Sequence, residues 1–155
     1  RGTTGLVVVA KHKLACALLE GRIEKEYLCL CEGVLPASGV YDGPIAVEEA
    51  GRLRRVVRAD GKPAVTHFER LRFGEDWSMA RVWLETGRTH QIRCHFADAG
   101  HPLLGDFLYG TETEAWSRPA LHCAQIRFPH PVTGRRIECR SELPRDMADF
   151  LSKDR

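Results

Sequence analysis

Arginine, histidine and glutamine side chains are concentrated in one short segment, Leu84 to His95, which has the sequence L-E-T-G-R-T-H-Q-I-R-C-H. Its hydrogen-bond donors are Arg88, His90, Gln91 and Arg93. At the start of a helix, where free backbone N–H groups attract anions, such donors can hold a phosphate and a base edge. Tyr27, near the start of a predicted strand, is either a stacking partner for a base or a half-buried sheet tyrosine. These residues indicate an RNA-binding site but do not define a reaction.

A metal site is a second interpretation of the same segment. His90 and Cys94 lie four positions apart, so they would share one face of a helix. Zinc ligands, however, usually come in close pairs at set spacings, and arginines on the same face disfavour a bound cation. The chain also lacks the common phosphate-loop, dinucleotide, nucleophile-elbow and zinc-protease motifs. We therefore expect no metal and no cofactor.

The elements that must position these side chains are short strands and helices. Alternating apolar and polar residues predict half-buried strands, whereas the continuous run L-V-V-V-A predicts a strand buried on both faces. Strands are expected over 6–10, 23–33, around 40, 64–73, 77–85, 120–128 and 135–141. Helices are expected over 12–20, from an N-cap at Thr89 to a stop at Gly100, and over 144–151. This order predicts an α+β fold with a mostly antiparallel sheet and a few short flanking helices, in a single domain spanning 1–155.

Length and charge set broader limits. A chain of 155 residues with 43% hydrophobic residues can bury one core. The net charge of +2 does not by itself indicate a nucleic-acid partner. Arginine makes up 18 of the 23 basic residues and suits phosphate contacts, although a GC-rich genome gives the same bias. The basic stretch 48–58 is either a solvated loop or a contact with the RNA backbone.

The six cysteines contain no Cys-x-x-Cys pair, so we expect free, buried thiols, with Cys16, Cys94 and Cys139 among apolar neighbours. No apolar run approaches the roughly 20 residues that a membrane span needs. We expect a monomeric cytoplasmic protein without a membrane partner. Because the sequence opens on R-G-T-T-G without a methionine, we also expect it to be a piece of a longer protein.

Several blocks along nearly the whole chain match one known pattern. They are R-G-T-T-G-L-V-V-V-A-K at 1–11, E-K-E-Y-L-C-L-C-E-G at 24–33, G-K-P-A-V-T-H-F at 61–68, T-G-R-T-H-Q-I-R-C-H at 86–95, G-H-P-L-L-G-D-F-L-Y-G at 100–110, R-P-A-L-H-C at 118–123 and F-P-H-P-V-T-G at 128–134. In their order and spacing, these blocks resemble the RluA-type pseudouridine synthases. The resemblance implies the catalytic-domain fold of that family and the isomerisation of uridine to pseudouridine in ribosomal or transfer RNA.

The resemblance also implies a set of site residues. Arg93 corresponds to the arginine that pairs with the catalytic aspartate, and Tyr27 to the tyrosine that stacks on the target base. Contacts with RNA are expected from Arg88, Thr89, His90, Gln91, Arg1 and Lys62. The target uridine is flipped out, its uracil detaches through an aspartate-dependent step and reattaches through C5, and no metal or cofactor is required.

Two departures from the family pattern affect these expectations. The family signature is H-R-L-D-x-x-[TS]-[ST]-G, and this sequence starts at its x-x-T-T-G part. We therefore expect the catalytic aspartate directly before Arg1 and expect the 155 residues alone to be inactive. The stretch 11–27 is shorter than in the family, so its helix should be truncated.

Alternatives remain at this point. The main alternative to the synthase is a non-catalytic RNA-binding module of the same fold. A metal-dependent hydrolase is the third candidate. Among the acidic residues, Asp106 is the most tempting nucleophile, but the resemblance makes it a structural turn residue. The loops around 34–60, and an accessory N-terminal domain, would determine which RNA is bound.

Overall fold

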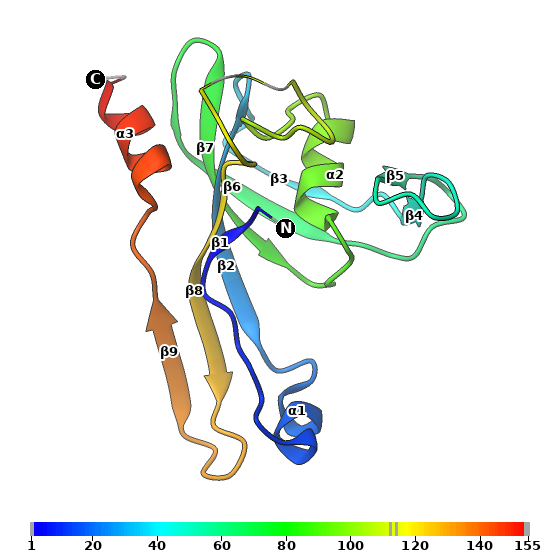
Figure 1. The fold of residues 1–155 in the computed structure, drawn as a ribbon, viewed down its shortest axis with the longest axis vertical. Coiled ribbons are helices and arrows are strands. Elements are labelled where there is room, and N and C mark those ends of the chain that lie inside the picture. The colour runs from blue at the N-terminus through cyan, green and yellow to red at the C-terminus, as the bar shows by residue number, and fades with distance from the viewer. Residues whose placement is uncertain (1, 112, 114, 154–155) are drawn as a thin grey trace.

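A computed structural model describes residues 2–111, 113 and 115–153. Seven strands form the main sheet, in the order β1-β8-β2-β7-β6-β3 with β9 added beside β8, and β4 and β5 form a separate pair (Figure 1). The strands are β1 (Thr4–Gly5), β2 (Glu24–Glu32), β3 (Ser38–Tyr41), β4 (Ile45–Val47), β5 (Arg55–Val57), β6 (Thr66–Phe73), β7 (Trp77–Leu84), β8 (Leu121–Pro129) and β9 (Arg136–Arg140). The helices are α1 (Lys13–Leu19), α2 (Gln91–Asp98) and α3 (Arg145–Lys153). Only β1 and β8 pair in parallel among these strands, so the predicted α+β fold with a mostly antiparallel sheet is confirmed.

The two faces of the sheet carry different helices, because successive residues of a strand point to opposite faces. Cys29 and Cys31 in β2 belong to the cluster that contains Ile92 and Phe96 of α2. Leu30, between them, belongs to the cluster that contains buried side chains of α3. Helix α2 therefore covers one face and α3 the other, with no further layer needed to bury the centre of β2.

The segment 6–10 is not the buried strand that its apolar run predicted. Strand β1 ends at Gly5, one more hydrogen bond joins Leu6 N to Cys123 O, and Val7 and Val9 are 76% and 78% exposed. The edge of β8 that β1 uses at positions 122–123 is taken by β9 from position 125 onward. Apolar composition gave no information about this competition for one strand edge, so the prediction was wrong.

The arginine-rich stretch forms a small projection rather than an irregular loop. Strands β4 and β5 pair over 45–57 and lie beside α2 (Figure 1). Two of its arginines make exposed ion pairs within the projection, Arg52 with Glu49 at 2.9 Å and Arg54 with Glu48 at 2.7 Å. These cations are partly neutralised by their own neighbours, as expected for a solvated surface.

Two other sequence expectations need correction. Cys16 and Cys139 are exposed, whereas the remaining four thiols are buried. The N-cap position of α2 is His90 and not Thr89, and no side-chain hydrogen bond caps this end of the helix. In the described part of the chain, no helix has both the length and the apolar character needed to cross a membrane.

Candidate functional site

A cavity of about 280 Å³ lies where β1, β2, β8 and the first turn of α2 meet. It brings together five of the side chains singled out in the sequence, namely Tyr27, Arg88, His90, Gln91 and Arg93. The opposite wall comes from the segment 3–7, at the very start of the chain. Residues that are far apart in the sequence therefore share one small space, as a binding site requires.

Arg93 forms the strongest electrostatic contact at this cavity, a buried pair with Asp106. Its Nε and Nη2 donate to the two carboxylate oxygens at 2.7 and 2.6 Å, and the side chains are only 4% and 0% exposed. Sequence analysis assigned Arg93 to a carboxylate outside this chain and did not foresee this partner. The sequence spacing between the blocks 86–95 and 100–110 contained no signal for this contact, because the contact depends on how the loop after α2 folds back.

Asp106 is fully occupied by structural contacts. Beside its two bonds with Arg93, its Oδ1 accepts from the backbone N of Leu108 at 3.1 Å and of Tyr109 at 3.2 Å. A side-chain oxygen that accepts from the following backbone amides fixes a tight turn. The interpretation of Asp106 as a turn residue agrees with this geometry, and it leaves no accessible carboxylate here for nucleophilic attack.

The buried side chain of Gln91 holds the turn before α2 in place through hydrogen bonds. Its Oε1 accepts from the Thr86 hydroxyl at 2.8 Å and the Arg88 backbone N at 2.9 Å. Its Nε2 donates to Val65 O at 2.9 Å and Thr66 Oγ1 at 3.1 Å. These four bonds use every hydrogen-bonding position of the amide. In this structure Gln91 organises the cavity wall, and its expected contact with RNA stays a prediction.

His90 occupies a strained backbone position at the start of α2. Its φ of 57° and ψ of 20° place it in the left-handed region, the only positive φ among the described non-glycine residues. Its Nδ1 lies 3.2 Å from the Tyr109 hydroxyl. Burial lowers the pKa of His90, and the nearby Arg93 lowers it further. His90 is therefore a neutral side chain at neutral pH, held by the same loop that Asp106 shapes.

Tyr27 lies on β2 at the junction of two cavities. It faces Val82 of β7 and Cys123 of β8, immediately after a bulge in the β2–β8 pairing. Burial, and then the neighbouring Cys123, raises the pKa of Tyr27 to about 12, so the phenol stays neutral. Beside lining the smaller cavity, Tyr27 lines a second one of about 980 Å³. A flat, uncharged ring at this junction suits stacking on a base.

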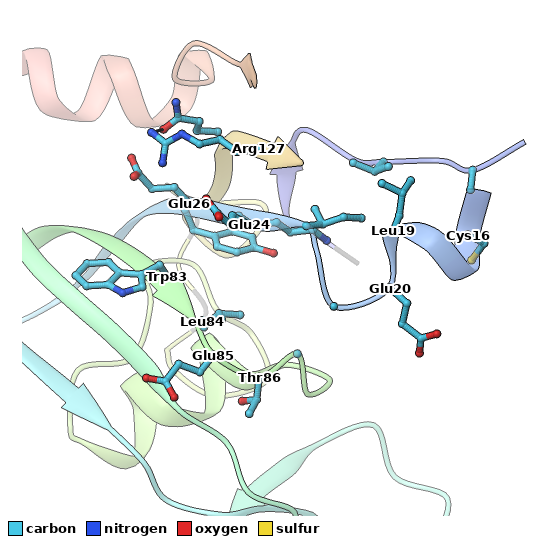
Figure 2. Close-up of a pocket in the computed structure, with 18 of the residues that line it drawn as sticks. Cys16, Leu19, Glu20, Glu24, Glu26, Trp83, Leu84, Glu85, Thr86 and Arg127 are labelled. Atoms are coloured by element: carbon cyan, nitrogen blue, oxygen red, sulfur yellow. Dashed lines mark hydrogen bonds between the residues drawn. The ribbon is translucent and has the colours of Figure 1, made fainter. Parts of the chain in front are cut away.

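The larger cavity has a different chemical character. Figure 2 shows Glu24, Glu26 and Glu85 among its labelled residues, together with Trp83 and Arg127. Its four glutamates outnumber its three cations, Lys25, Arg81 and Arg127. The smaller cavity is lined by Lys25, Arg88 and Arg93 and by no carboxylate, so it is the better site for a nucleotide.

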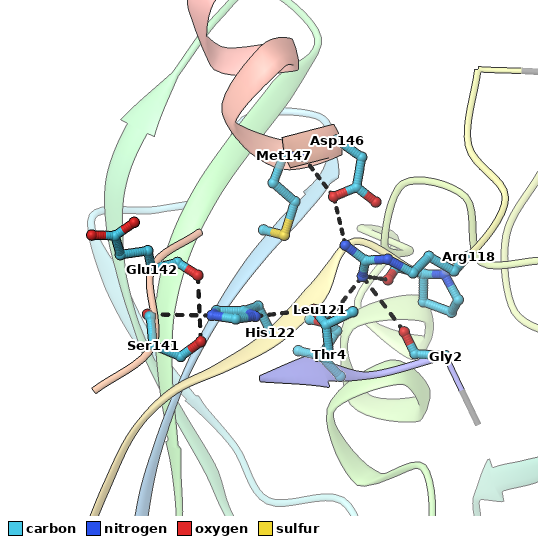
Figure 3. Close-up of polar contacts among 10 residues, drawn as sticks. Gly2, Thr4, Arg118, Leu121, His122, Ser141, Glu142, Asp146 and Met147 are labelled. Carbon is cyan, nitrogen blue, oxygen red and sulfur yellow. Dashed lines mark hydrogen bonds and ion pairs between the residues drawn. The ribbon is translucent and has the colours of Figure 1, made fainter. Parts of the chain in front are cut away.

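A polar network missed by sequence analysis anchors the start of the chain (Figure 3). Arg118 Nη1 donates to Pro119 O at 2.9 Å and approaches Gly2 O at 3.5 Å, while its Nη2 pairs with Asp146 of α3 at 2.6 Å. The Thr4 hydroxyl lies 3.0 Å from Nδ1 of the buried His122. The R-P-A-L-H-C block was the available signal, but only the fold reveals what it holds. This network fixes the backbone that forms one wall of the cavity.

Gly5 explains how that wall approaches β8 so closely. Its φ is +94°, and an added Cβ would lie 2.2 Å from Cys123 O. Neither the conformation nor the space admits a side chain. The glycine of the R-G-T-T-G block is therefore needed for the wall to form.

Three other predicted contacts lie at the surface, and of these Arg88 also lines the smaller cavity. Arg88 and Thr89 are exposed, and Arg88 Nε donates to Pro63 O at 2.9 Å. Lys62 is exposed and does not line either cavity, although its backbone exchanges two hydrogen bonds with Ile45. Arg1 lies outside the described residues. Within the described ranges, no group of three His, Cys, Asp or Glu side chains could hold a metal ion.

Comparisons with known proteins identify relatives of this chain. A family model described as RNA pseudouridylate synthase matches residues 1–98. Ribosomal large subunit pseudouridine synthase D of Haemophilus ducreyi is 39% identical over 170 aligned positions, which cover 97% of this chain and 52% of that protein. An uncharacterized RNA pseudouridine synthase of Bacillus subtilis is 40% identical over 96% of this chain and 52% of its own length.

A solved structure shares the fold. Human RNA pseudouridylate synthase domain containing 1 superposes with a TM-score of 0.71 at 23% identity, covering 94% of this chain and 73% of that one. The chain spans about half the length of the curated relatives that it matches. From the match over residues 1–98 and these identities, the chain belongs to the RNA pseudouridylate synthase family.

Proposed function

We propose that this chain carries the uridine-binding part of the active site of an RNA pseudouridine synthase, acting on ribosomal or transfer RNA. The observation that carries the proposal is the arrangement around Arg93. Asp106 binds its Nε and Nη2, while no described residue accepts from Nη1. Arg93 also lines the cavity together with Tyr27 and the segment 3–7. One arginine is thus held rigidly and still has a donor for a second carboxylate.

We propose that the gene encodes that carboxylate as an aspartate directly before Arg1. The proposal is supported by Thr3 and Thr4, which line the same cavity as Arg93. A cation within ~4–6 Å lowers the pKa of a carboxyl group, so Arg93 would keep the aspartate ionised and able to attack. Asp106 would serve as the fixed support that aims Arg93 and would take no part in the reaction.

The reaction then follows from base flipping. Extracting a uridine from its stack costs a few kcal/mol, which stacking on Tyr27 would offset. The aspartate would promote cleavage of the bond from C1′ to N1, the uracil would turn, and C1′ would bond to C5. The proton lost from C5 is balanced by the one gained at N1, so the product is an isomer of the substrate. His90, neutral and held by Tyr109, would keep the loop in place beside the base.

The family relationship also supports the remaining expectations on partners and location. Relatives named as ribosomal large subunit pseudouridine synthases favour RNA as the partner and the cytoplasm as the compartment. We propose a monomer, which light scattering of the purified protein would test. The alternative, a non-catalytic RNA-binding module of the same fold, predicts a residue other than aspartate before Arg1.

The decisive experiment uses the protein with the residues that its gene places before Arg1. It is incubated with an unmodified ribosomal RNA transcript, and pseudouridine is detected by carbodiimide labelling and primer extension. The protein with the aspartate should form pseudouridine, and its asparagine variant should not. The Arg93→Lys variant should be strongly impaired, because an ammonium cannot bind Asp106 in a two-point contact and a second carboxylate together. A folded, RNA-binding protein without activity would favour the binding module instead.

A further inference from the structure

Phe107 is a large apolar side chain in an unusual place. It is 57% exposed and directly follows Asp106, the fixed partner of Arg93. The loop around it is held by bonds from Leu108 N and Tyr109 N to Asp106 Oδ1, and by Gly110 N to Asp106 O at 2.8 Å. The ring therefore stands on a rigid support in spite of its exposure.

Its neighbour is the central cation of the candidate site. The Arg93 guanidinium carbon lies over the Phe107 ring, 5.5 Å from the centroid, and over the Tyr109 ring at 5.1 Å. Arg93 lines the smaller cavity and Phe107 does not, so the ring lies next to the proposed base site, on the far side of its contact with Arg93. An aromatic ring next to an arginine is the combination that proteins use to hold unpaired bases.

Other exposed aromatic side chains lack this setting. Phe73 is 58% exposed and lies over Arg70 at 4.2 Å, but it is at the end of β6, and its partner Arg70 lines neither cavity. Trp83 is 40% exposed and stacks on His67, but the larger cavity that it lines is rich in carboxylates. Position beside Arg93, and not exposure alone, distinguishes Phe107.

We propose that Phe107 stacks on a nucleotide that flanks the flipped uridine. This inference rests on the proposed function and assigns a positioning residue to it. When a uridine leaves the stack, each neighbouring base loses a stacking partner. The Phe107 ring replaces that partner for one neighbour, which holds the RNA backbone in place while Tyr27 receives the uracil.

The test is a binding measurement on the 155-residue chain. The probe is a short fluorescein-labelled single strand with one uridine between adenosines, and fluorescence anisotropy gives Kd. Phe107→Ala should raise Kd about tenfold, within the range for loss of one base–aromatic stack. Phe107→Trp should keep the binding, and Phe73→Ala, which removes an equally exposed ring elsewhere, should leave Kd unchanged. Because Phe107 is exposed, its replacement should not alter the circular dichroism spectrum.

Strands that lack one base separate stacking from a structural effect. With an abasic site in place of the adenosine that stacks, the unaltered chain should bind as weakly as Phe107→Ala does, and the substitution should have no further effect. Equal Kd values for the unaltered chain and Phe107→Ala on the intact strand overturn the inference. The inference is also overturned if Phe107→Ala raises Kd by the same factor on strands that are abasic on either side of the uridine. It is overturned as well if the unaltered chain does not bind the intact strand. Base-dependent binding through Phe107, with no pseudouridine formed by the longer protein, would uphold this inference and overturn the proposed function.

Discussion

Asp106 occupies only one edge of the Arg93 guanidinium. The carboxylate takes Nε and Nη2, and within the described residues nothing accepts from Nη1. Both side chains are almost completely buried, at 4% and 0% exposure. The pair therefore fixes the loop after α2. The Nη1 group of Arg93 remains as a donor for a further ligand.

Removing Asp106 should destabilise the protein strongly. Asp106→Ala leaves a buried guanidinium without its counter-charge, which typically costs about 3–5 kcal/mol of the free energy of unfolding. Urea unfolding followed by circular dichroism measures the change. The matched control is Glu49→Ala, which breaks the exposed Arg52–Glu49 pair and should cost less than about 1 kcal/mol. Similar small losses in both variants would contradict the structural task of Asp106.

Replacing Gln91 should also reduce stability, although its side chain carries no charge. Gln91→Leu removes the acceptor of the Thr86 hydroxyl and of the Arg88 backbone N, and it removes one partner of the buried Thr66 hydroxyl. An unsatisfied buried polar group costs about 1–3 kcal/mol, and urea unfolding again gives the value. Thr89→Ala, two positions earlier on the same turn, is the control and should be nearly neutral, because His90 occupies the N-cap position of α2. A large loss in the Thr89 variant would show that the helix begins where the sequence predicted.

The backbone of His90 predicts a reversed ranking of alanine and glycine. In an ordinary helix alanine is more stable than glycine, but the φ of 57° at His90 disfavours any residue with a Cβ by about 1–2 kcal/mol. Both His90→Ala and His90→Gly lose the contact with Tyr109, so their difference isolates the backbone effect. We expect the glycine variant to be the more stable one in urea unfolding. The control is Ala97→Gly, inside α2, which should lower stability by about 1 kcal/mol, the usual order of the two residues in a helix.

The three tyrosines should resist ionisation in the folded protein. Burial raises the pKa of Tyr27 and of Tyr41 from 10.0 to about 12, and it also raises that of Tyr109. The folded state therefore holds phenolic protons that the unfolded state releases near pH 10. This contribution to stability is complete below pH 10 and is lost as the pH rises toward 12.

Ultraviolet absorbance of the phenolate measures this directly. The native protein should show almost no tyrosine ionisation at pH 10, whereas the protein in urea should be about half ionised there. Buried thiols also lower the stability at alkaline pH, because burial raises the pKa of Cys31 from 9.0 to about 12. Their effect begins at a lower pH than that of the tyrosines, since an unfolded thiol ionises near pH 9. A native titration centred near pH 10 would contradict the burial of all three rings.

The sequence was sufficient for the fold class and for most strand positions because alternation along β2, β6 and β7 reflects one buried face directly. It failed at 6–10, where the outcome depends on which of two segments takes the edge of β8. The site showed the same division. Local spacing brought Arg88, His90, Gln91 and Arg93 to one turn, but the partners of Gln91 and Arg93 come from distant segments. Such contacts follow from packing, which no local pattern encodes.

Thiol reactivity should separate the exposed from the buried cysteines. Cys16 and Cys139 are exposed and the other four are buried, all of them free. The thiolate is the reactive form, and burial raises the pKa of Cys29, Cys31, Cys94 and Cys123. Ellman's reagent should therefore label two thiols rapidly in the native protein and all six in urea. The double variant Cys16→Ser with Cys139→Ser should lose the rapid phase entirely. A rapid phase that survives in this variant would show that one of the four remaining thiols is accessible, which would contradict their burial.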